Sequence, residues 1–155
     1  MELPQRKPLR LESWDYGEDG YYFITICTKD KRNLFGRIVG NGLDRSAVGT
    51  IAETHLIDLP NHFPLVRLDK YVVMPNHIHA ILVIDHRQAE RSRPFPTLST
   101  MVGLYKSGVS RAAGFPVWQK SFHDHIIRGK EDYRMIWDYI DQNPLKWMLD
   151  RYYTE

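Results

Sequence analysis

Two consecutive stretches of β-prone residues, 66–75 and 77–84, constrain the fold of this chain more than any other feature. The second, HIHAILVI, is apolar almost throughout, and successive strand side chains point to opposite faces, so both of its faces should be buried. Only Pro75-Asn76 separates the two stretches, which predicts a tight turn and an antiparallel hairpin. We therefore expect 77–84 to be a central strand of a sheet that is covered on both sides.

The remaining periodicity predicts three more strands and three helices. Strands are expected at 21–28, 34–40 and 117–128. Helices are expected at 46–63, 98–113 and 130–148. Ser46 is the expected N-cap of the first helix, and Pro60 and Pro64 should close it. The third should lose regularity near Asn143, which precedes a proline. This order predicts an α+β fold, an antiparallel sheet with helices packed on it.

A chain of 155 residues without an internal repeat or a linker is expected to form a single domain, 1–155. Residues 1–20 are expected to form an irregular N-terminal arm, and the polar, proline-containing segment 85–97 a flexible loop. No apolar run approaches membrane-spanning length, and the N-terminus lacks an apolar signal core. The single cysteine, Cys27, suits a reducing compartment. We expect a cytoplasmic protein with no membrane partner.

Basic residues are unevenly distributed along a chain whose formal net charge is only +2. Residues 86–111 carry five lysines and arginines against one acid, and the N-terminal arm adds three more bases. Basic segments of this kind suit a polyanionic partner such as a nucleic acid. Surface charge that serves only solubility is the alternative, and charge by itself favours that alternative.

The histidines that begin the apolar strand are candidates for a metal site. His77 and His79 should share one face of the strand, roughly 6–7 Å apart. Neutral imidazoles bind divalent metals readily, and two of them could converge on one cation. Two hydrogen-bonded histidines at the end of a strand are the alternative. A catalytic ion needs a third protein ligand, and the candidates elsewhere in the chain are His123, His125, Asp141, Gln142 and Asn143.

Two segments together resemble a known family. YVVMPNHIHAILVI and VWQKSFHDHIIRGKEDYRMIWDYIDQNPLKW are similar to the REP-associated tyrosine transposases, a group of single-tyrosine HUH transposases in which U is a hydrophobic residue. His77-Ile78-His79 matches that motif, and the similarity extends from about residue 8 onward. The resemblance implies a ferredoxin-like antiparallel sheet with the HUH motif on a central strand.

The resemblance also implies an activity and roles for individual residues. It implies cleavage and rejoining of single-stranded DNA at hairpin, REP-like sequences through a 5′-phosphotyrosine intermediate. Tyr139 matches the nucleophile, and Asn143 matches the polar residue that completes the metal site with His77 and His79. One helical turn separates Tyr139 from Asn143, so both should lie on one helix face. The expected ion is Mg²⁺ or Mn²⁺, held without any anionic protein ligand.

The expected partner is single-stranded or hairpin DNA, bound by a monomer or a homodimer. The candidate DNA-binding residues are Arg6, Lys7, Arg10, Lys106, Arg111, Arg128 and Lys130. Two other functions stay open at this point. One is a catalytically silent module that binds hairpin DNA or RNA. The other is a metal-dependent phosphodiesterase that uses water, with no role for Tyr139.

Overall fold

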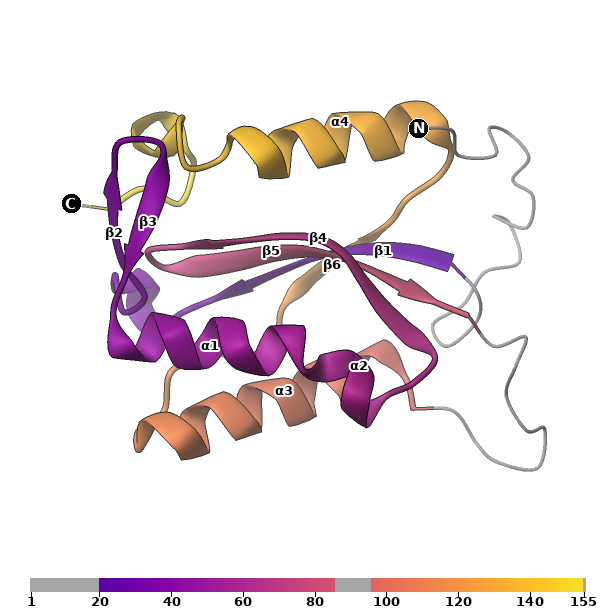
Figure 1. Cartoon of the computed structure of the whole chain (residues 1–155), viewed down its shortest axis with the longest axis horizontal. Coiled ribbons are helices and arrows are strands. Elements are labelled where there is room, and N and C mark those ends of the chain that lie inside the picture. The colour runs from indigo at the N-terminus through magenta and orange to yellow at the C-terminus, as the bar shows by residue number, and fades with distance from the viewer. Residues whose placement is uncertain (1–19, 86–95, 155) are drawn as a thin grey trace.

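The two stretches 66–75 and 77–84 pair as predicted in the structure, a computed structural model that describes residues 20–85 and 96–154 (Figure 1). β4 (Val66–Met74) and β5 (His77–Ile84) are joined by the turn at Pro75-Asn76 and lie antiparallel. β1 (Gly20–Cys27) pairs with the other side of β5, and β6 (His123–Ile126) pairs with β1. The strand order β4-β5-β1-β6 places β5 inside the sheet.

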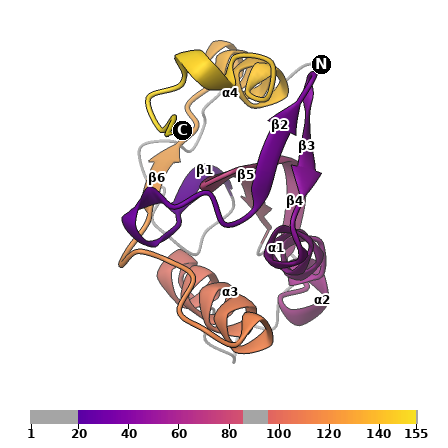
Figure 2. The ribbon, with the colours of Figure 1, turned by 90° about the vertical axis from the view of Figure 1, so that its left-hand side faces the viewer.

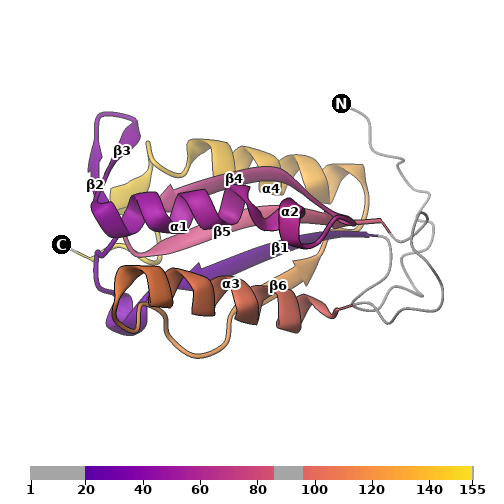
Figure 3. The same cartoon turned by 60° about the horizontal axis from the view of Figure 1, so that its bottom comes forward.

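Helices cover both faces of this sheet (Figure 2). α1 (Ala47–Ile57), α2 (Leu59–His62) and α3 (Leu98–Ala113) lie on one face, with α1 and α3 side by side (Figure 3). α4 (Lys130–Gln142) lies on the other face, and the 3-10 turn η3 (Trp147–Leu149) follows it. The path β1-α1-β4-β5-α3-β6 is the ferredoxin-like arrangement. The predicted α+β fold is confirmed.

The alternation of side chains along β5 divides the interior into two apolar clusters. Ile78 and Leu82 belong to the larger cluster, which also contains the buried faces of α1 and α3. Ile81 packs on the opposite side with Tyr133 and Ile140 of α4. All eight residues of β5 are buried. His77 and His79 share the α4 side with Ile81, so α4 covers the strand end that carries both histidines.

Four expected elements differ in extent from the structure. The helix expected at 130–148 ends at Gln142, next to Asn143, where it was expected to lose regularity. The helix expected at 46–63 is divided at Asp58 into α1 and α2, because Pro60 lacks the amide hydrogen that a continuous helix would need. The strand at 117–128 contracts to β6, and Ser121 before it adopts a left-handed φ of 58°. The strand at 34–40 becomes β2 (Gly36–Val39), paired in a separate hairpin with β3 (Gly42–Arg45).

Some expectations fall outside the described residues. The N-terminal arm, except for Gly20, and residues 86–95 of the expected loop belong to this group. Within 20–85 and 96–154, no helix has the length and apolar character that crossing a membrane requires.

Candidate active site

His77 and His79 converge beneath the C-terminal end of α4. Their ring centroids are 4.5 Å apart, and their exposed fractions are 0% and 1%. The rings are closer than the spacing along a strand, because the two side chains tilt toward each other. The predicted shared face is confirmed.

Each imidazole uses its Nδ1 atom in a buried hydrogen bond. His77 Nδ1 lies 2.8 Å from Asn76 Oδ1, and His79 Nδ1 lies 2.8 Å from the Thr25 hydroxyl. Among residues 20–85 and 96–154, the Nε2 atom of either histidine has no hydrogen-bond partner. Metal-binding histidines commonly direct one nitrogen to a protein group and the other to the ion. The pair has the hydrogen bonding of a metal site.

Burial keeps both imidazoles neutral. It lowers the pKa of His77 to about 3, although the nearby Asn143 side chain raises that pKa in part. Burial also holds the pKa of His79 well below its usual range, helped by the positive charge of Arg151 and by the neighbouring His77, since two adjacent imidazoles disfavour each other's protonation. A neutral imidazole is the form that binds a metal. Both residues are therefore ready ligands at neutral pH.

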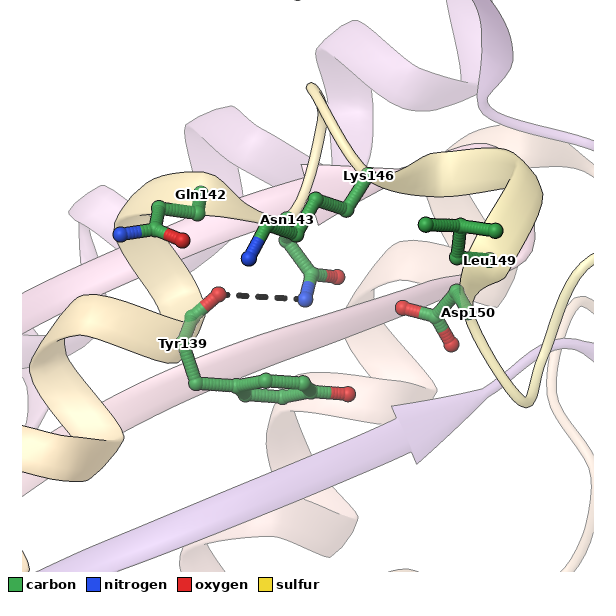
Figure 4. Close-up of a pocket in the computed structure, with 6 residues that line it drawn as sticks. All are labelled: Tyr139, Gln142, Asn143, Lys146, Leu149 and Asp150. Carbon is green, nitrogen blue, oxygen red and sulfur yellow. Dashed lines mark hydrogen bonds between the residues drawn. The ribbon is translucent and has the colours of Figure 1, made fainter.

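The end of α4 brings Tyr139 and Asn143 to the histidines, although these segments are about 60 residues apart in the chain. The Tyr139 ring lies 5.1 Å from the His79 ring, centroid to centroid, and Tyr139 is 39% exposed. Asn143 Nδ2 donates to the Tyr139 carbonyl oxygen at 3.2 Å (Figure 4). Asn143 Oδ1 is buried and, within the described residues, lacks a partner. The structure thus brings together the four residues singled out in the sequence.

Three buried side-chain atoms that lack hydrogen-bond partners among the described residues therefore belong to this site: Nε2 of His77, Nε2 of His79 and Oδ1 of Asn143. Unpaired buried acceptors are rare and costly in folded proteins. Two imidazole nitrogens and an amide oxygen suit a divalent cation, so these residues fit the ion that the resemblance implies. Burial raises the pKa of Tyr139, opposed by the neighbouring Asn143 side chain, so the phenol is not ionised by the protein alone.

An acidic residue at the site was missed by the sequence reasoning. One ligand atom each from His77, His79 and Asp150 lie within 4.8 Å of one another. Burial raises the pKa of Asp150. Asp150 is thus a candidate anionic ligand that the site predicted from the sequence did not include. Asp150 lies beyond the last long helix, where no periodic pattern marks it.

The segment around Asp150 also contributes aromatic rings. The Tyr152 ring lies 4.5 Å from the His77 ring, and the Trp147 ring lies 6.2 Å from it. A small open pocket of about 160 Å³ lies between α4 and this segment (Figure 4). Its lining residues are Tyr139, Gln142, Asn143, Lys146, Leu149 and Asp150. The pocket leaves one side of Tyr139 open to a substrate.

The other candidate ligands lie in different places. Asp141 Oδ1 accepts from Lys70 Nζ at 2.8 Å, and Gln142 lines the pocket together with Tyr139 and Asn143. His123 and His125 lie on β6, and β1 separates that strand from β5. His125 Nε2 lies 2.8 Å from an Asp132 carboxylate oxygen.

The basic residues proposed for DNA binding are not gathered at the pocket. Lys106 Nζ donates to the carbonyl oxygens of Gln119 and Ser121, both at 2.9 Å. Arg111 is exposed on α3, and Arg128 and Lys130 lie at the end of α4 remote from Tyr139. Arg6, Lys7 and Arg10 lie outside the described residues. The cations beside the site, which the sequence reasoning missed, are Lys31, Lys146 and Arg151.

Comparison with known proteins finds relatives but no matching family model. An uncharacterized protein of Haemophilus influenzae is 33% identical over 99% of this chain and 96% of its own length. The REP-associated tyrosine transposase of Escherichia coli is 31% identical over 80 residues, which make up 51% of this chain and 44% of that protein. Among solved structures, a REP-associated tyrosine transposase bound to a REP hairpin matches with a TM-score of 0.66 at 24% identity, over 86% of this chain and 72% of that one.

Proposed function

We propose that this chain belongs to the family of the REP-associated tyrosine transposases and that it cleaves and rejoins single-stranded DNA at hairpin sequences, with Tyr139 as the nucleophile. The observation that carries the proposal is that three buried polar side-chain atoms, unpaired within the described residues, converge beside the partly exposed Tyr139. A binding module would have no physical reason to keep those atoms unpaired.

Mg²⁺ or Mn²⁺ would be held by His77, His79 and Asn143, with Asp150 as a further ligand, and would neutralise charge on the scissile phosphate. An Asp150 oxygen makes the donor set anionic and better suited to a hard cation than two imidazoles and an amide. Substitution of either histidine should therefore weaken binding of the metal ion.

The reaction is a transesterification at phosphorus. The Tyr139 oxygen forms a bond to phosphorus as the bond to the 3′ oxygen breaks, and the 3′ oxygen takes up a proton to become a hydroxyl. The phenol proton leaves to solvent, which reaches Tyr139 because that side chain is 39% exposed. The 5′-phosphotyrosine keeps the energy of the phosphodiester, so a 3′-hydroxyl can reverse the step without a nucleotide cofactor.

DNA contacts are proposed in two groups. Lys146 and Arg151 lie beside the pocket and would bind phosphates next to the scissile bond. Six of the seven residues proposed from the sequence would contact the hairpin farther away: Arg6, Lys7, Arg10, Arg111, Arg128 and Lys130. The seventh, Lys106, is left out because its ammonium donates to main-chain carbonyl oxygens. Since one chain carries the nucleophile and the metal ligands together, the arrangement supports a monomer that acts in cis.

The free, buried Cys27 suits the cytoplasm, where we place the protein.

Incubation of the protein with a labelled single-stranded hairpin and Mn²⁺, followed by denaturing electrophoresis, tests the proposal. The wild type should form a covalent adduct, and Tyr139→Phe should form none. Tyr152→Phe is the matched control, since the Tyr152 ring lies 4.5 Å from the His77 ring, as the Tyr139 ring lies 5.1 Å from the His79 ring, but Tyr152 has no assigned chemistry. This control should retain the adduct.

Each of the other outcomes would support a different function for this chain. Cleavage that survives Tyr139→Phe would mean that water is the nucleophile, and the chain would be a phosphodiesterase. If the adduct is lost in Tyr152→Phe but not in Tyr139→Phe, Tyr152 is the nucleophile. Hairpin binding by a wild type that forms neither adduct nor cleaved strand would favour the silent binding module.

A further inference from the structure

We propose that Asn76 is a positioning residue of the metal site. Its side-chain amide fixes the tautomer of His77 and ties to that histidine the segment that carries Asp150. The inference rests on the proposed function only in taking His77 as a metal ligand.

The Asn76 side chain points inward from the turn between β4 and β5 and is 1% exposed. Its Nδ2 atom donates to the carbonyl oxygen of Tyr152 at 2.7 Å and to that of Lys31 at 3.3 Å. Main-chain carbonyls can only accept, so the amide nitrogen must face them and Oδ1 must face His77. The orientation of the amide is therefore determined by its neighbours.

That orientation selects the tautomer of His77. An amide oxygen can only accept, so the proton shared at 2.8 Å belongs to His77 Nδ1. The Nε2 atom of the neutral ring then carries a lone pair, and it is the atom left unpaired at the site. His79 differs, because the Thr25 hydroxyl can donate or accept and selects neither tautomer.

The same amide connects His77 to the C-terminal segment. The Tyr152 carbonyl receives the shorter of the two Nδ2 bonds, and the Tyr152 ring lies 4.5 Å from the His77 ring. Asp150, two residues earlier, brings a carboxylate oxygen to within 4.8 Å of the histidine nitrogens. Asn76 thus couples the orientation of one ligand to the placement of an acid 74 residues away in the chain.

Two variants separate these two roles. Asn76→Ala removes both. Asn76→Asp keeps an oxygen acceptor for His77 but loses the donor to Tyr152. Thr28→Val is the matched control: Thr28 is fully buried beside the same turn, and its hydroxyl donates to the carbonyl oxygens of Asn76 and Arg32 rather than to a histidine.

The test uses two measurements, one on the metal-free protein and one during titration with Mn²⁺. Nitrogen-detected NMR at neutral pH reports which imidazole nitrogen of His77 is protonated, and calorimetry reports Mn²⁺ affinity. Wild type, Asn76→Asp and Thr28→Val should keep the proton on Nδ1, whereas Asn76→Ala should lose that preference. Asn76→Ala should also bind Mn²⁺ roughly 10- to 100-fold more weakly. Asn76→Asp should show faster amide exchange around Tyr152, and Thr28→Val should match the wild type.

A wild-type His77 protonated on Nε2 would overturn the proposal, and so would equal losses of Mn²⁺ affinity in Asn76→Ala and Thr28→Val. If Asn76→Ala does not fold, two results still test the proposal: the tautomer of His77 in the wild type, and the tautomer and amide exchange in Asn76→Asp. Neither measurement needs DNA, so failure of the adduct assay would refute the proposed function and leave this inference standing. If the wild type binds no Mn²⁺, His77 is not a Mn²⁺ ligand and the proposal fails whatever the tautomer.

Discussion

Acid should destabilise the metal-free protein through His77. In the folded chain, burial lowers the pKa of this residue from 6.5 to about 3. Between those two values the unfolded chain binds a proton that the folded chain does not. The free energy of unfolding therefore falls as the pH falls from 6.5 toward 3, and the contribution is fully present only above pH 6.5.

The expected magnitude follows from the size of the pKa change. The whole window corresponds to about 5 kcal/mol, of which about 2 kcal/mol is lost by pH 5. For a chain of this length, that loss should lower the melting temperature by roughly 4–8 °C between pH 7.5 and pH 5. The pKa of His79 is lowered as well, so its titration adds to the effect in the same direction.

Thermal unfolding in a chelator at several pH values measures the effect. The variant His77→Gln stays uncharged and should show a shallower dependence of melting temperature on pH than the wild type. The same substitution at His123, which is exposed on β6, is the control. The reasoning would be refuted if the melting temperatures of wild type and His77→Gln depended on pH to the same extent. An NMR titration that gave His77 a pKa near 6.5 would refute it as well. Mn²⁺ at 100 times its dissociation constant should add about 2.7 kcal/mol of stability.

Two further substitution pairs test the site and the packing. Asp150→Asn should weaken Mn²⁺ binding roughly tenfold or more, because it removes an anionic oxygen beside the histidine nitrogens, whereas Asp141→Asn should leave calorimetric affinity unchanged. Equal affinities for both variants would show that Asp150 is not a ligand. Gly49→Ala should lower the free energy of unfolding by about 1–3 kcal/mol or more, since its Cβ would lie 2.2 Å from the Phe35 carbonyl oxygen. Gly103→Ala meets nothing within 4 Å and should raise it by about 1 kcal/mol in denaturant unfolding, and the opposite order would contradict this packing.

The sheet could be predicted because its pattern is local. Residues 77–84 alternate between two faces that are both apolar, and a strand with two buried faces must lie inside a covered sheet. The edge strand β6 could not be bounded this way. Val117 and Trp118 are apolar like strand residues, but both belong to the cluster on the α3 side, and Trp118 only bridges Thr28. Tertiary packing therefore decided their conformation.

The residues of the site could be predicted from the sequence to different degrees. The shared face of His77 and His79 followed from strand geometry, whereas Tyr139 and Asn143 were chosen through a family resemblance. Asp150 had no sequence signal, because its position depends on a contact between Asn76 and Tyr152 across 76 residues. Long-range hydrogen bonds of this kind leave no periodic trace in a sequence.

Four buried side-chain atoms lack hydrogen-bond partners within the described residues, and their distribution indicates where chemistry belongs. Trp118 Nε1 is alone in the larger apolar cluster, and as a donor it has no means of binding a cation. The other three are two imidazole nitrogens and an amide oxygen from two distant segments, and each costs roughly 1–3 kcal/mol if left unpaired. A fold has little reason to gather three such costs at one point unless a group from outside the chain satisfies them together. The convergence of these three atoms, rather than their burial alone, therefore supports the proposed metal site over a packing defect.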